Sequence, residues 1–208
     1  MKKGKVIIIS GPSGTGKGTI VIDYMKRRAD RTKLSVSATT RSPRPTDVEG
    51  ETYFFYTKEK FISLAENGGM LEYAEYCGNF YGTPREPIER WANEGKDVIL
   101  EIEVQGGLNV KSKDKEVLMV FVMPPSAEVL KSRLVNRGTE TEETLRARLT
   151  ADIREIDEAE KYDYILVNDN LSDAVDELER VIDGGLRNVD DMMNFVKGVQ
   201  NDVKTLCK

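Results

Sequence analysis

The sequence contains no histidine among its 208 residues. This absence excludes Ser-His and Cys-His catalysis and any metal site built on imidazole, so the chemistry must run on other groups. Only two cysteines occur, Cys77 and Cys207, and they are too far apart in sequence to suggest a disulfide framework or a zinc site. No apolar run approaches the about 20 residues that a membrane-spanning helix needs.

The chain also lacks a net positive charge, since 31 Lys and Arg stand against 36 Asp and Glu and the net charge is −5. A general nucleic-acid binder needs a basic surface, so nucleic acid is not an expected partner, whereas locally clustered Arg and Lys can still hold small anions. The apolar stretch at residues 6–9 is too short for a signal-peptide core. We therefore expect a cytoplasmic protein that does not associate with a membrane.

What is present is an alternation of short apolar runs with amphipathic segments. It predicts an α/β fold, with a parallel sheet flanked by helices. Expected core strands lie at 5–10, 34–37, 97–102, 117–123 and 164–167. Expected helices lie at 19–29, 126–135 and 171–182, with a further helical face formed by Leu145, Leu149, Ile153 and Ile156.

Between these segments the pattern changes to short elements typical of a small β-rich insertion. Expected strands lie at 53–57, 70–76 and 79–83, and expected helices at 61–66 and 84–94. We divide the chain into a core (1–34, 97–125 and 158–208), an inserted subdomain (35–96) and a helical lid (126–157). The tail after Gly185 has apolar residues at helical spacing and no functional interpretation.

The most specific motif is G-P-S-G-T-G-K-G-T between the first strand and the first helix. It matches the phosphate loop, whose backbone N–H groups and helix N-terminus bind phosphates while its lysine reaches the β- and γ-phosphates. Position 18 is Gly18, where the general motif has a Mg²⁺-contacting Ser or Thr, so Thr19 or water takes that role. The expected ATP-binding residues of the loop are Gly11, Pro12, Ser13, Gly14, Thr15, Gly16, Lys17, Gly18 and Thr19.

Several further motifs, in order along the chain, resemble those of guanylate kinases. They are S-V-S-A-T-T-R-S-P-R at 35–44, G-E-T-Y-F-F at 50–55, L-E-Y-A at 71–74, G-N-F-Y-G-T at 78–83, L-E-I-E-V-Q-G at 100–106 and R-L-V-N-R-G-T-E-T at 133–141. The resemblance covers residues 5–182. It implies a phosphate-loop kinase that transfers the γ-phosphate of Mg·ATP to GMP, and to dGMP, with no organic cofactor. It leaves open a monomer or a homodimer.

Two arginines spaced by prolines form the expected acceptor-phosphate site. Arg41 and Arg44 lie on a backbone stiffened by proline, where two guanidinium groups can hold one phosphate through paired hydrogen bonds. Tyr53 and Tyr81 can add phenol donors, and the resemblance implies this role for all four residues. Without the resemblance, a solvated basic loop and half-buried tyrosines would be the simpler interpretation.

Base recognition is expected at Glu72 and Thr83. A carboxylate accepts from the adjacent N1–H and N2 amine of guanine, whereas adenine offers no such donor pair and would leave the carboxylate unpaired. Thr83 can donate to guanine O6, and Ser37 matches a family position that contacts the nucleotide. An ordinary strand-edge carboxylate is the alternative for Glu72.

Two carboxylates, Glu101 and Glu103, follow the apolar run 98–100 of the third expected core strand. Such groups orient magnesium or its waters when they face a phosphate loop. The family usually has Asp at both positions, so each side chain here is one methylene longer. Either glutamate can instead help to bind the base or ribose of GMP.

The last cluster is basic and lies in the expected lid. The resemblance implies that Arg137 and Arg148 are catalytic, together with Lys17 and Arg41, and that Arg133 contacts ATP by stabilising charge on the transferred group. Arg146 is expected to lie on a salt-bridged surface instead. Asn168 and Asp169 follow the last strand, where the family contacts the adenine side of ATP.

Three other functions are compatible with part of this pattern. A guanylate-kinase-like binding module without catalysis typically lacks the loop lysine and lid arginines, yet Lys17, Arg137 and Arg148 are all present. A kinase for AMP or dTMP is disfavoured by Glu72 with Thr83. A regulatory GTPase is disfavoured because the N-K-x-D signature is missing.

Overall fold

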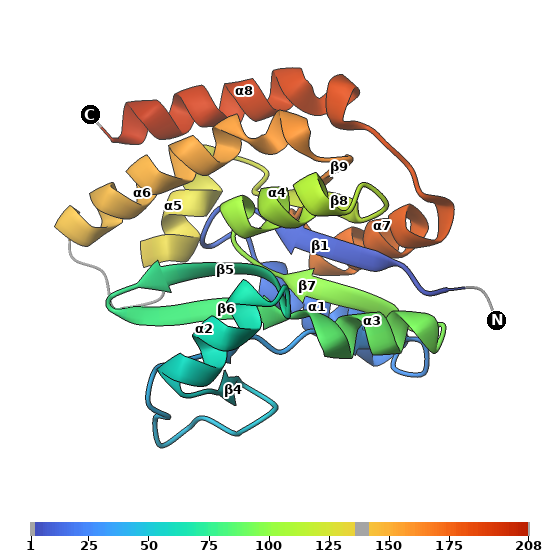
Figure 1. Cartoon of the computed structure of the whole chain (residues 1–208). Helices are drawn as coiled ribbons and strands as arrows, with labels where there is room; N and C mark the ends of the chain where they lie inside the picture. The colour runs from blue at the N-terminus through green and yellow to red at the C-terminus, as the bar shows by residue number, and fades with distance from the viewer. Residues whose placement is uncertain (1–2, 136–141, 208) are drawn as a thin grey trace.

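The computed structural model describes residues 3–135 and 142–207, and its central layer is a five-stranded sheet (Figure 1). All four strand pairings in this sheet are parallel. Its strands, in spatial order, are β2 (Thr32–Leu34), β7 (Asp97–Glu101), β1 (Val6–Ser10), β8 (Leu118–Met123) and β9 (Tyr164–Val167). Helices cover both faces, which explains the continuous apolar runs of these strands. The predicted α/β class is confirmed.

Alternate residues of the strands feed two apolar clusters, one on each face of the sheet. Ile7 and Ile9 join α1 (Lys17–Arg27) and α7 (Leu171–Gly184), whereas Ile8 faces the opposite cluster. That opposite cluster contains five helices among the described residues (Figure 1). They are α3 (Arg85–Asn93), α4 (Val104–Lys113), α5 (Ala127–Val135), α6 (Glu142–Asp157) and α8 (Val189–Leu206).

The insertion forms a second, four-stranded sheet. Its strands, in spatial order, are β4 (Phe54–Phe55), β3 (Ala38–Thr39), β6 (Asn79–Pro84) and β5 (Met70–Tyr76). The helix α2 (Lys58–Glu66) packs its buried Phe61 beneath this sheet with Ala38 and Met70. The predicted β-rich insertion is therefore present, although β3 was not predicted and the expected strand at 53–57 is reduced to the two residues of β4.

A β-bulge interrupts the pairing of β5 with β6. Met70 pairs with Pro84 and Tyr73 pairs with Gly82, so Leu71 and Glu72 together lie opposite a single residue, Thr83. The bulge turns the Glu72 side chain toward Thr83, with which it forms a hydrogen bond. A Cβ atom on Gly82 would lie only 2.7 Å from the Glu72 carbonyl oxygen, so the close approach of the strands requires glycine there.

One helix and one core strand differ from the sequence-based expectation. The helix α4 was not predicted, because Gly106 and Gly107 lower its intrinsic helix propensity and packing decides its conformation. Strand β2 lies at Thr32–Leu34 rather than at 34–37, since Thr32 and Lys33 pair with β7.

The tail forms α8, whose buried valines pack on the central layer beside α6, and the buried Gln200 donates to the carbonyl of Ile153 on α6. Within the two described segments, no helix is both long and apolar enough to cross a membrane.

Candidate active site

The site lies where the carboxyl ends of the parallel strands meet, because loops that leave neighbouring strands at one edge converge there. The phosphate loop leaves β1 and turns into α1 at Gly16, which has a left-handed backbone with φ of 86°. Gly11 and Gly14 also have positive φ, 142° and 84°. Only glycine adopts such angles without strain, so the loop can turn its N–H groups inward as an anion nest.

The ammonium of Lys17 folds back over this loop. Its Nζ donates to the carbonyl oxygen of Gly11 at 2.5 Å and to that of Pro12 at 2.9 Å. Thr15 is buried and holds the turn closed by donating its hydroxyl to the same Pro12 carbonyl at 2.9 Å. These two hydrogen bonds hold the lysine ammonium against the phosphate loop.

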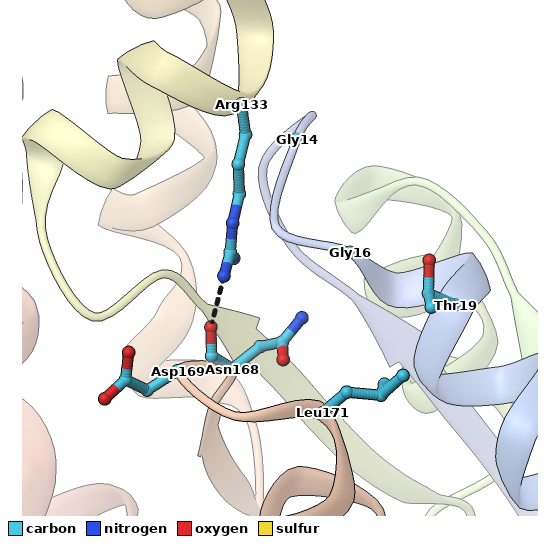
Figure 2. Close-up of a pocket in the computed structure, with 7 residues that line it drawn as sticks. All are labelled: Gly14, Gly16, Thr19, Arg133, Asn168, Asp169 and Leu171. Atoms are coloured by element: carbon cyan, nitrogen blue, oxygen red, sulfur yellow. Dashed lines mark hydrogen bonds between the residues drawn. The ribbon is translucent and has the colours of Figure 1, made fainter. Parts of the chain in front are cut away.

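A cavity of about 310 Å³ opens beside the phosphate loop (Figure 2). Asn168 is buried at the end of β9 and donates its Nδ2 to the Thr15 carbonyl at 2.7 Å. Arg133 reaches from α5 and donates to the Asn168 carbonyl at 2.9 Å. The remaining lining residues include Thr19, from the first turn of α1, and Asp169. The structure thus brings together six of the residues expected to bind ATP, from three separate segments of the chain.

A second cavity, of about 550 Å³, is lined by residues of β5 and β6, of the end of β7 and of α4. Six of the nine residues expected to bind GMP line it, namely Ser37, Tyr53, Glu72, Tyr81, Glu101 and Glu103. Thr83 lies behind Glu72 as its hydrogen-bond partner. Arg41 contacts Tyr53, with its guanidinium carbon 5.4 Å from the ring centre. Tyr53 and Tyr81 meet edge to face, with ring centres 6.1 Å apart.

The loop that carries the two arginines is organised by Asp47, which the sequence analysis missed. The Asp47 carboxylate pairs with the Arg41 guanidinium at 2.9 Å and accepts from the backbone N–H of Arg44 at 2.7 Å. The Arg44 hydrogen bond and the nearby Arg41 keep the pKa of Asp47 below its usual range. No pattern around Asp47 announces this role, because both contacts depend on the folded loop.

Glu72 and Thr83 form a tight pair at the base of the second cavity. The Thr83 hydroxyl donates to Glu72 Oε1 at 2.5 Å, and Thr83 is fully buried. Burial raises the pKa of Glu72, while the Thr83 hydrogen bond and the Lys113 ammonium oppose that rise. The second carboxylate oxygen, Oε2, lies beside Gly106 of α4.

Glu101 lies beside the phosphate loop. It lines the second cavity, and its carboxylate oxygens lie 3.5 Å and 3.7 Å from where a Cβ atom of Gly18 would stand. The carboxylate therefore faces the loop position that carries Ser or Thr in the general motif. The carboxylate of Glu101 and the hydroxyl of Thr19 are oxygen donors of the kind that Mg²⁺ prefers. Among the described residues no cluster of three or more acidic, Cys or His side chains could hold a metal by itself.

Two further acidic residues approach the phosphate loop from α6, and neither was predicted. Asp152 is 2% exposed and accepts from the backbone N–H of Ser13 at 3.1 Å. Burial raises the pKa of Asp152 to about 6 and that of Glu155 to about 7, the latter also because Glu103 is close. Both lie on the buried side of an amphipathic helix, where a leucine or alanine would be expected, so a polar residue on that face was the available signal.

The basic residues of the expected lid are only partly described. Arg137 lies outside the described residues. Arg148 on α6 is close enough to Asp152 to oppose the rise in its pKa. Arg146 turns away and donates its Nε to the carbonyl of Cys207 at 2.8 Å, which agrees with its expected surface role.

Comparison with known proteins places the chain among related sequences and structures. The family model described as Guanylate kinase matches residues 3–184. A guanylate kinase of Clostridium tetani is 46% identical over 182 residues, covering 88% of this chain and 86% of its own length. One of Clostridioides difficile is 44% identical, covering 94% of this chain and 95% of its own. The crystal structure of guanylate kinase from Anaplasma phagocytophilum superposes with a TM-score of 0.68 at 30% identity, covering 88% of this chain and 87% of its own.

Proposed function

This chain belongs to the guanylate kinase family and phosphorylates GMP to GDP with ATP, and we propose that its two cavities align the substrates for direct, in-line transfer. The observation that supports this arrangement is the position of Glu101. Its carboxylate lines the larger cavity and faces the phosphate loop at Gly18, and the same loop lines the smaller cavity with Gly14, Gly16 and Thr19. A nucleotide in each would bring donor and acceptor phosphates together there.

The acceptor phosphate is held, in this proposal, by Arg41, Arg44, Tyr53 and Tyr81. Arg41 already lies against the ring of Tyr53, and Tyr53 contacts Tyr81, so three of the four donors are gathered before substrate binds. Asp47 holds Arg41 and the backbone of Arg44 in one loop. Two guanidinium groups and two phenols suit a doubly charged phosphate.

The base is recognised by the Glu72 carboxylate, with Ser37 as a further contact, whereas Thr83 is buried behind Glu72 and donates to it rather than to guanine O6 as expected. Thr83 occupies Glu72 Oε1 at 2.5 Å and so orients the carboxylate, whose other oxygen stays available to guanine donors. Guanine satisfies this group with N1–H and the N2 amine, and adenine leaves it desolvated and unpaired. Glu72 is proposed to contact the base and not the sugar, so we expect dGMP to be accepted as well.

The phosphates of ATP bind the loop 11–19, with Lys17 on the β- and γ-phosphates. Arg133, Asn168 and Asp169 line the adjoining cavity and contact the rest of the nucleotide. Arg137 and Arg148 stabilise charge on the transferred group. The family generally uses Mg·ATP, and we assign the metal-facing positions to Glu101 and Thr19. A bound Mg²⁺ would neutralise charge on the phosphate oxygens.

No enzyme nucleophile and no strong general base is required. A GMP phosphate oxygen is already ionised near neutral pH, and the sequence has no histidine to act as a base. Direct transfer inverts the configuration at the γ-phosphorus, whereas a phosphoenzyme intermediate would retain it. Analysis of GDP made from ATP with an isotopically chiral γ-phosphate should show inversion, and retention would refute direct transfer.

The base assignment has its own test, the variant Glu72→Gln. Its amide turns a donor toward the guanine N1–H and N2 amine in place of an acceptor, so kcat/KM for GMP should fall about 100-fold or more. KM for ATP should stay within about twofold. A variant that loses ATP binding instead would show that Glu72 serves the other cavity.

The remaining elements of the proposal concern the whole protein. We assign it to the cytoplasm, where it recycles GMP into the purine nucleotide pool, and we expect a monomer or a homodimer. The inserted subdomain (35–96) and the lid (126–157) are proposed to close on the core and exclude water from the site.

A further inference from the structure

The β-bulge in β5 presents Glu72 to the acceptor cavity, and a neighbouring helix contacts it on two sides. The bulge disrupts the strand ladder at Leu71 and Glu72, so the local backbone needs another source of hydrogen bonds. The Leu71 carbonyl finds one in Lys113, the last residue of α4, whose Nζ donates to it at 2.9 Å. This bond joins residues 42 apart in sequence.

The second contact involves a glycine two turns earlier on the same face of α4. Gly106 and Lys113 are seven residues apart, which places them above one another on a helix. A Cβ atom on Gly106 would lie 3.1 Å from Glu72 Oε2 and 3.4 Å from its Cδ. The missing side chain is therefore what leaves room for the carboxylate.

We infer that α4 is the positioning element for base recognition, with Lys113 fixing the bulge that presents Glu72 and Gly106 leaving the space in which its carboxylate lies. This inference rests on the proposed role of Glu72. Lys113 and Gly106 are positioning residues, because they act on guanine through Glu72. Since α4 begins directly after Glu103, the same helix links the base-reading carboxylate to the strand end that faces the phosphate loop.

Helix α4 affects the ionisation of the Glu72 carboxylate as well as its position. The groups that face Glu72 are Thr83 from β6 and Lys113 from α4. The same cavity is also lined by Glu75 of β5, Glu101 at the end of β7 and Glu103 just after it, and by the phenols of Tyr53, Tyr73, Tyr76 and Tyr81. Lys113 is the cation among these groups. It favours the ionised carboxylate that guanine requires, against the effect of burial.

The first experiment removes the Lys113 ammonium and keeps most of its stem. Lys113→Met should raise KM for GMP by about 3- to 10-fold, the range expected for one lost hydrogen bond, with kcat and KM for ATP within about twofold. The acid limb of the kcat/KM profile for GMP should move to higher pH, because Glu72 then takes up its proton more readily. Lys113→Arg should restore most of both losses.

The matched control is Lys115→Met, which removes the same charge from an exposed position two residues further on. Lys113 is itself an exposed residue, so neither change should threaten folding. Equal KM values and equal pH profiles for the Lys113→Met and Lys115→Met variants would overturn the inference.

The second experiment fills the space beside the carboxylate. Gly106→Ala favours helix formation yet crowds Glu72 Oε2, so KM for GMP should rise several-fold while the unfolding midpoint does not fall. Gly198→Ala on α8 makes the same exchange where no heavy atom lies within 4 Å, and it should leave KM unchanged. An unchanged KM in the Gly106→Ala variant would contradict the role of Gly106.

The Glu72→Gln variant, assayed in parallel, tests base recognition by Glu72 separately from its positioning by α4. If it loses GMP selectivity while the Lys113→Met and Gly106→Ala variants match their controls, positioning by α4 is wrong and the base assignment stands. If Glu72→Gln itself keeps full GMP use, the base assignment fails and the inference about α4 falls with it.

Discussion

At the scale of single residues, Lys17 lies in a network of charge that the phosphate-loop motif alone does not reveal. Burial lowers the pKa of Lys17, and the carboxylates of Glu103, Glu155, Glu101 and Asp152 oppose that shift. Incoming phosphates therefore compete for a lysine that already has acidic neighbours. The loop and its surrounding carboxylates form one electrostatic unit.

We predict that Lys17→Met lowers kcat by about 10²- to 10⁴-fold, because the variant loses the preorganised ammonium that stabilises negative charge on the transferred phosphate. GMP binding, measured by calorimetry without ATP, should change by less than about threefold. Full activity in this variant would refute the phosphate-loop assignment, and a matching loss of GMP binding would show that the change is structural rather than local.

Asp152 gives a prediction about pH. Its pKa rises from 3.8 to about 6 in the folded protein, so the folded state binds the proton more tightly than the unfolded chain. Stability therefore falls as pH rises from about 4 to 6 and stays lower above that range. Asp152→Asn keeps an acceptor for Ser13 N–H and cannot ionise, so it should be more stable than the parent at pH 8, on the order of 1–3 kcal/mol.

Urea unfolding at pH 8 and at pH 4.5 would measure this difference, which should shrink at the lower pH. Asp202→Asn, an exposed change on α8, is the control and should leave both values unaltered. A stabilisation by Asp152→Asn that is equal at the two pH values would contradict the titration argument.

The residues that could be predicted from sequence are those with a local motif. The phosphate loop comes from a short run of defined spacing, whereas the roles of Arg41, Glu72 and Thr83 come from the family resemblance. The structure places the loop beside the first cavity and Glu72 in the lining of the second. Asp47 could not be predicted, because its contacts depend on a loop conformation. A polar residue on the buried face of α6 was a signal for Asp152, but its partner Ser13 lies 139 residues away in sequence and could not be inferred. A hydrogen bond between residues far apart in the chain leaves no periodic pattern in the sequence from which it could be predicted.

At the scale of elements, tertiary packing holds the C-terminal tail, which carries no recognisable motif, against the core as helix α8. Val203 is fully buried, and the helix packs beside α6 and α5. We predict that Val203→Ala lowers the free energy of unfolding by about 2 kcal/mol through loss of buried methyl groups. Both KM values should remain those of the parent enzyme.

The control for this change is Ile22→Ala, in which the side chain is 56% exposed on α1. It should shift stability by about 0.5 kcal/mol or less. Urea denaturation followed by circular dichroism measures both variants. Equal stability in the Val203→Ala and Ile22→Ala variants would mean that α8 does not contribute to the core.

Elements with a strong local signal in the sequence were predicted, whereas elements with a weak local signal were not. Strands β1, β5 and β9 match their expected ranges to within a residue, because buried apolar runs and a turn between β5 and β6 mark them in the sequence. Helix α4 was missed since adjacent glycines weaken its local preference. The two-residue β3 is defined by its pairing with β4 and β6, which no local signal encodes.

At the scale of the whole molecule, two cavities on different segments mean that each substrate should stabilise the fold by binding. At a GMP concentration about 100 times its Kd, the expected gain is about 2.7 kcal/mol, or roughly 5–10 °C in Tm for a chain of this size. Thermal unfolding should show this rise in the parent protein and little of it in the Glu72→Gln variant. An equal rise in both would contradict base recognition by Glu72.

The central claim is that one site reads guanine while the other supplies the phosphoryl group from ATP. A coupled assay for ADP production, run with GMP, AMP, dTMP and UMP as acceptors, tests it most directly. We predict that kcat/KM for GMP exceeds that for each of the other three by at least about 10³-fold, because only guanine satisfies the Glu72 carboxylate. Equal rates with GMP and AMP would contradict the claim.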